Sequence, residues 1–147
     1  MPKPLKGNIN RRRKQRGSAF VEFALASTLL VPLLFGVMDF GRLFYASIEV
    51  ANAAAAGANY GSRNAGNMTD ATGISTAAKN DSPDLPSMTV ASSKVCQDNS
   101  GASVDCSSSS AYQYVSVTAS YTFQTTFNYP LIPSSVPLNK TVMMRGK

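Results

Sequence analysis

The hydrophobic pattern begins with one almost continuously apolar stretch. Residues 18–38 read SAFVEFALASTLLVPLLFGVM, in which Glu22 is the one charge among 21 residues. A helix of this length spans about 30 Å, the thickness of one bilayer core, so residues 18–38 predict a transmembrane helix. Pro32 and Gly36 lie inside it, and a kink or local loosening near Pro32 is expected.

A helical pattern continues after this stretch. Apolar residues recur at spacings of three and four from Phe40 to Ala58, which predicts a helix over residues 39–64 that ends between Gly61 and Gly66. From Ala51 the sequence, ANAAAAGANYGSR, is mostly small. Small residues let another backbone approach closely, so they favour a packing surface against the chain's own domain or a neighbouring subunit. The alternative is a helix that is rich in alanine only because alanine favours helices.

Residues 65–147 have the pattern of a small β-rich domain. Strict alternation predicts a half-buried strand at Tyr112–Gln124, with Val115, Val117, Ala119, Tyr121 and Phe123 on one face. Two further strands are expected at Met88–Val95 and Leu138–Met144. A weak helical segment at Asp70–Lys79 has Asp70 as its expected N-cap, and a loop containing Pro130, Pro133 and Pro137 precedes the last strand.

The positive charge is concentrated at the N-terminus. The chain has a formal charge of +6, but residues 1–17 contain seven Lys and Arg and no acid. Removing those seven from the fourteen Lys and Arg leaves seven, against eight Asp and Glu, so the remainder is nearly neutral. A nucleic-acid-binding domain is therefore not expected, because its basic surface should lie on the folded part.

The basic run RRRKQR has three interpretations: a nuclear signal, a nucleic-acid-binding arm, or the cytoplasmic flank of a membrane helix. Its position directly before the apolar stretch favours the flank, since Lys and Arg remain on the cytoplasmic side. We therefore expect residues 1–17 to be a cytoplasmic basic leader without regular structure, and residues 65–147 to lie outside the cytoplasm.

The two cysteines, Cys96 and Cys106, fall in the expected extracytoplasmic part. An even pair in an oxidising compartment more often forms a disulfide than a metal site, and two free thiols are the alternative. Closing this loop would contribute roughly 2–3 kcal/mol in the chain-entropy model. The expected fold is thus α+β: a long N-terminal helix followed by a small antiparallel sheet with a disulfide loop.

Catalytic chemistry is not indicated. The chain has no histidine, which excludes the usual Ser-His and Cys-His pairs, and its acids are scattered. No phosphate-binding loop, dinucleotide motif or metal-ligand cluster is present in the sequence, so we expect no cofactor and no enzymatic activity.

Glu22 is the feature that a simple anchor does not explain. A carboxylate in hydrocarbon costs on the order of 2.5–3.5 kcal/mol on insertion scales. A secretory signal peptide is disfavoured, because its apolar region normally runs about 7–15 residues and contains no acid. An uncleaved signal anchor is the other alternative. Only Glu22 and the preceding Gly17 speak against it, because such an anchor gives neither residue a role.

The sequence from Gly17 to Arg63 resembles the TadE-like proteins, minor pilins or pseudopilins of the tight-adherence pilus within the type IV pilin superfamily. The resemblance is carried by G-x-x-x-VEFAL starting at Gly17, by Pro32, by Asp39 and by the later alanine-rich helix. A strand containing YTF and a final MMR are also typical of that family. The major Tad pilin is a much shorter chain, so a minor component is expected.

This resemblance implies a function. Prepilin peptidase would cut between Gly17 and Ser18 on the cytoplasmic face of the inner membrane, which would place Glu22 fifth in the mature chain. Glu22 would pair with the new α-amino group of Ser18 or of a neighbouring pilin during assembly; a carboxylate that reaches water at the interface is the alternative. The expected partners are the peptidase, other pilins or pseudopilins, the inner-membrane assembly platform and the membrane. The alternative function is an uncleaved bitopic protein whose outer domain binds a partner.

Overall fold

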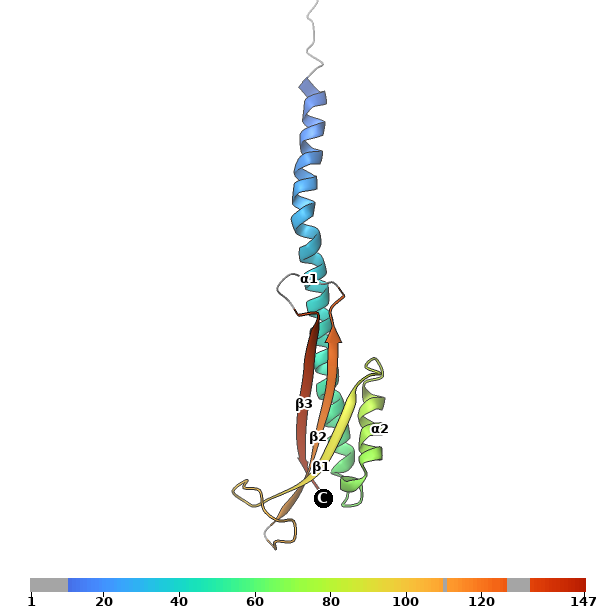
Figure 1. Ribbon diagram of the computed structural model, residues 1–147, viewed down its shortest axis with the longest axis vertical. Helices are drawn as coiled ribbons and strands as arrows, with labels where there is room; N and C mark the ends of the chain where they lie inside the picture. The colour runs from blue at the N-terminus through green and yellow to red at the C-terminus, as the bar shows by residue number, and fades with distance from the viewer. Residues whose placement is uncertain (1–10, 110, 127–132) are drawn as a thin grey trace, which may run out of the picture. The chain divides into compact units, whose positions relative to one another are not determined.

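The computed structural model describes residues 11–109, 111–126 and 133–147 (Figure 1). The first ten residues of the expected leader and Pro130 of the expected loop lie outside the described residues. Within them the chain forms a long apolar helix, a three-stranded antiparallel sheet and a Cys96–Cys106 disulfide, which confirms the predicted α+β fold. The elements are α1 (Arg11–Gly61), a 3₁₀ helix η1 (Asn67–Thr69), α2 (Ala71–Asp81), β1 (Thr89–Gln97), β2 (Tyr112–Gln124) and β3 (Ser135–Arg145).

Helix α1 begins earlier than the sequence suggested. Residues 11–17 were expected to lack regular structure, but they are helical from Arg11. The physical reason is that Arg, Lys and Gln are good helix formers and no proline interrupts this part of the chain. The helix is present on both sides of Pro32 and ends at Gly61, and the kink at Pro32 stays a prediction.

The chain divides into two compact units, Met1–Phe40 and Gly41–Lys147. In the first unit, the large apolar side chains of α1 between Phe20 and Phe40 are exposed; Phe20 and Leu29 are 75% and 74% accessible. The second unit contains the rest of α1, η1, α2 and the sheet. It buries its own hydrophobic core, whereas the apolar helix of the first unit has no such cover within its own described residues.

The sheet has the order β1-β2-β3, with both neighbouring pairs antiparallel. Strand β2 has the predicted bounds, while β1 extends to Gln97 and β3 begins at Ser135, before the expected start. Pro137 thus lies inside a strand rather than in the preceding loop. An edge strand tolerates proline because the missing N–H can face away from the ladder.

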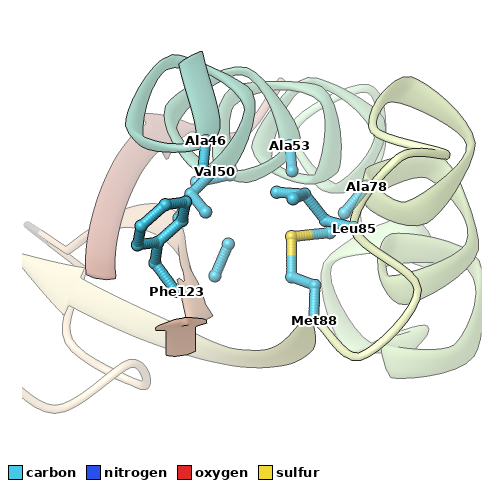
Figure 2. Packing of buried hydrophobic residues seen from close by; sticks show 9 residues of the cluster. Ala46, Val50, Ala53, Ala78, Leu85, Met88 and Phe123 are labelled. Atoms are coloured by element: carbon cyan, nitrogen blue, oxygen red, sulfur yellow. The ribbon is translucent and has the colours of Figure 1, made fainter. Parts of the chain in front are cut away.

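The core of the second unit lies between the two helices and one face of the sheet. Figure 2 shows Ala46, Val50 and Ala53 of α1 on one side, with Ala78 of α2, Leu85, Met88 and Phe123 around the same interior. A second cluster contains Ala58, Met68, Ile74, Val115 and Val117. The inward positions of β2 are those that its alternation predicted, and only Tyr121 among them is partly exposed. Burial of the alternate positions therefore follows from the period-two pattern.

Candidate processing segment and packing surface

The N-terminal part of α1 has the length and composition of a membrane span. Among the described residues, the segment from Gly17 to Gly61 is the one helix that qualifies, and its most apolar window has a mean hydropathy of 2.0 with no residue buried. A helix that is apolar all round and uncovered by its own chain needs an apolar environment or neighbouring helices. The predicted span of residues 18–38 lies within this segment.

Glu22 and Ser18 lie one turn apart on the same side of α1. The Ser18 hydroxyl donates a hydrogen bond to Glu22 Oε1 at 3.3 Å, and both side chains are exposed. Residues four apart are neighbours on a helix, so the backbone nitrogen of Ser18 lies about one turn before Glu22. This spacing is what a pairing between the carboxylate and a new N-terminus would need.

Gly17 has no packing role within the described chain. A Cβ placed on it would meet no heavy atom within 4 Å beyond its immediate neighbours, and the backbone there is helical. Neither a close approach nor a left-handed conformation requires glycine at this position. The described fold thus does not itself require glycine at residue 17.

The alanine-rich part of α1 packs against the chain's own domain. Ala53, Ala54 and Ala58 are completely buried. A Cβ on Gly57 would lie 3.1 Å from Val117 Cγ1, and one on Gly61 would lie 2.9 Å from Val115 Cγ2. The sequence left open whether the small residues pack against the chain's own domain or a neighbouring subunit. In the structure they allow α1 to approach β2 of the same chain closely.

Polar contacts that the sequence did not reveal join α1 to the segment around α2. The buried hydroxyl of Ser82 donates to the backbone oxygen of Glu49 at 2.9 Å, and the Tyr45 hydroxyl donates to Asp84 Oδ2 at 3.2 Å. No periodic signal marks such pairs, because their partners are 33 and 39 residues apart in the sequence. They fix the position of α2 on the helix in addition to the apolar core.

Asp70 is the N-cap of α2, as predicted. Its Oδ1 accepts the Gly73 N–H at 2.9 Å, and its Oδ2 accepts the Tyr60 hydroxyl at 2.9 Å. The Gly73 N–H first, and the Tyr60 hydroxyl second, hold the pKa of Asp70 below its ordinary value because both favour the charged carboxylate. The same residue therefore begins α2 and ties it to the end of α1.

The disulfide closes a loop at the end of β1. The Cα atoms of Cys96 and Cys106 are 5.2 Å apart, and the Val104 N–H donates to the Cys96 carbonyl at 2.9 Å. Within the loop, Asp98 Oδ1 accepts the Ser100 hydroxyl at 2.6 Å and the backbone N–H groups of Ser100 and Ala102. These bonds, led by the Ser100 hydroxyl, lower the pKa of Asp98. The predicted disulfide is confirmed, and internal hydrogen bonds order its loop.

In the part of the chain that the structure describes, no three His, Cys, Asp or Glu side chains come together in a way that could hold a metal ion. What the geometry defines instead is a class of membrane-anchored proteins. One apolar helix of membrane-spanning length is followed along the chain by a small disulfide-bonded α+β unit.

The comparison with protein families agrees with this class. The family model described as TadE-like protein matches residues 17–59. Over that segment the chain is similar to TadE-like proteins, which confirms the resemblance seen in the sequence and supports an association with Tad pili. Searches of curated proteins and of solved structures gave no match.

Proposed function

We propose that this chain is a minor pilin or pseudopilin of a Tad-type adhesive pilus. Prepilin peptidase removes residues 1–17 by cleavage after Gly17 on the cytoplasmic side of the inner membrane. Residues 18–38 span that membrane, 39–64 continue the helix, and 65–147 form an extracytoplasmic domain. The mature chain then joins other pilins or pseudopilins at the assembly platform. The observation that carries this proposal is the TadE-like match over residues 17–59, which begins at the proposed cleavage site.

The position of Glu22 supports a role in assembly. Cleavage after Gly17 would make Ser18 the first residue of α1, so that a new amine and the positive end of the helix dipole would lie within one turn of Glu22. The Ser18–Glu22 contact already spans that turn. Pairing with this amine, or with that of a neighbouring pilin, compensates a carboxylate that is otherwise costly in hydrocarbon.

The exposed side of α1 supports lateral packing of helices. Ile48 is 58% accessible, while Val50 and Ala54 on the same helix are buried in the chain's own core. The helix therefore keeps an exposed apolar side chain after its own domain has been packed. Assembly would cover this side chain with a helix of another subunit.

The experiment is to replace Glu22 by glutamine in cells that lack the native copy. The substitution Glu22→Gln keeps the size of the side chain and its hydrogen bond to Ser18 but removes the charge. We expect normal membrane insertion and at least a tenfold loss of the protein from sheared pili, measured by immunoblotting of both fractions.

The matched control is Glu49→Gln, which removes an acid from the same helix in the second unit. It should leave incorporation unchanged, because the contact of Glu49 to Ser82 uses the backbone oxygen, and glutamine can still accept the side-chain hydrogen bond from Tyr45. Equal incorporation of Glu22→Gln and the wild type would contradict the pairing role.

A further inference from the structure

The face of the sheet that does not contact the helices forms a flat surface across all three strands. The register places its residues in rows, such as Thr89-Ser120-Asn139, Ala91-Thr118-Thr141 and Ser93-Ser116-Met143. We call these residues, together with Val95, Gln97, Tyr112, Tyr114, Thr122, Gln124, Ser135, Pro137 and Arg145, the outer face. Neighbouring side chains are about 5 Å apart across strands and about 7 Å along a strand.

No described helix covers the outer face. The buried residues of α1 and α2 meet the opposite positions of β2, namely Val115, Val117, Ala119 and Phe123. All six outer positions of β3 are exposed, as are Thr89, Ala91 and Ser93 of β1. The surface is therefore open across its width within the described part of the chain.

The outer face is dominated by uncharged hydrogen-bonding groups. Thr118 and Thr141 share a hydrogen bond of 2.8 Å between their hydroxyls. The hydroxyls of Ser93, Ser116 and Thr122 make no hydrogen bond to another described residue, so they can both donate and accept. The outer face thus presents hydroxyl and amide side chains, several of which can still form hydrogen bonds with a ligand.

Charge is almost absent from this face. Arg145 is its one charged residue among the strand positions, and its guanidinium lies 3.9 Å from the centre of the Tyr112 ring. The two lysines in the strands, Lys94 and Lys140, lie at positions of the opposite face of the sheet. With one cation and no acid, the face offers little attraction to a charged ligand and suits one that is itself uncharged.

The chemistry of the face selects among ligands. A nucleic acid or an anionic polymer would need several cations, and only Arg145 is present. A dry protein interface is disfavoured, because burying a hydroxyl without a partner costs free energy and because serine is depleted from interface cores. A neutral polymer rich in hydroxyls can form hydrogen bonds with these side chains and lay an apolar ring face on Tyr114.

We propose that the outer face binds neutral polysaccharide. Tyr114 provides the stacking surface, and the rows through Ser116 and Thr118 provide hydrogen bonds. Because the face lies entirely on the three strands, this binding is separate from the role of Glu22 in assembly. It adds a ligand to the proposed function without depending on it.

The experiment measures binding of the full-length protein in a sugar-free polyoxyethylene detergent to insoluble cellulose and β-1,3-glucan, with alginate beads as the anionic counterpart. Thr141→Glu places a carboxylate on the outer face, where it would lose water on binding. We expect it to weaken binding to the neutral polymers at least tenfold. Tyr114→Ser should weaken binding about tenfold, the loss expected for one aromatic contact.

The matched control is Thr76→Glu, the same replacement at an exposed position of α2 away from the sheet. It should bind like the wild type. The proposal is overturned if the wild type fails to bind either neutral polymer, if it prefers alginate, or if the two glutamate variants behave alike. It is also overturned if Thr141→Glu only disrupts self-association measured without polysaccharide, since the face would then be an interface between copies of this chain.

Discussion

The two parts of α1 differ in side-chain size and in what covers them. Between Phe20 and Phe40 the apolar side chains are large and exposed, whereas from Ala46 to Gly61 the buried ones are mostly alanine, with glycine at the closest contacts. Large exposed side chains need lipid or other helices, while small ones allow close packing on the chain's own sheet. Side-chain size along α1 thus distinguishes the part that needs cover from lipid or other helices from the part that packs on the chain's own domain.

The largest effect should come from removing a core side chain of the second unit. Ile74 is completely buried between α1 and β2, so Ile74→Ala should lower the free energy of unfolding by about 2–5 kcal/mol. The matched variant Leu29→Ala changes an exposed residue of the first unit and should leave that unfolding transition unchanged. Denaturant titration of the protein in detergent, followed by circular dichroism, measures both. Equal losses would contradict the separation of the two parts.

Removing the disulfide should have the next largest effect. Cys96→Ser combined with Cys106→Ser opens a loop of nine intervening residues and should cost about 2–3 kcal/mol of the second unit's stability. Labelling of free thiols in protein isolated from cells tests where the second unit lies. An extracytoplasmic domain should contain no thiol that reacts before reduction. Two reactive thiols in the wild type would contradict the proposed location of residues 65–147.

A smaller effect tests the close approach of α1 to β2. Gly57→Val introduces a branched side chain where a Cβ alone would lie 3.1–3.3 Å from Val117 and Ile74, so overpacking should cost about 1–3 kcal/mol. Gly41→Val is the control on the same helix, because a Cβ there meets nothing within 4 Å. It should change stability by less than about 0.5 kcal/mol. Thermal unfolding of the two variants distinguishes them, and equal midpoints would argue against a tight contact at Gly57.

Much of the fold follows from local patterns. The alternation in Tyr112–Gln124 predicted both the bounds of β2 and its buried face, since a strand buried on one side repeats every two residues. Asp70 was identified as a cap because its side chain can accept the free N–H groups at a helix start. The apolar length of residues 18–38 likewise predicted a helix that is long and apolar enough to cross a membrane.

The features that could not be predicted depend on contacts between distant residues. Small residues in α1 fit the chain's own sheet or a foreign helix equally well, and only the positions of Val115 and Val117 decide between them. The contact from Ser82 to Glu49 has no local signature. The hydroxyls of β2 were visible in the sequence, but the register with β1 and β3 was needed to assemble the outer face.

The central claim, that residues 1–17 are removed after Gly17 to create an amine beside Glu22, is tested most directly by sequencing the N-terminus of the protein purified from cells with and without prepilin peptidase. We expect the mature chain to begin Ser-Ala-Phe-Val-Glu when the peptidase is present, and residues 1–17 to remain attached when it is absent. A wild-type protein that begins at Met1 or Pro2 in both strains would contradict the claim and favour an uncleaved bitopic membrane protein.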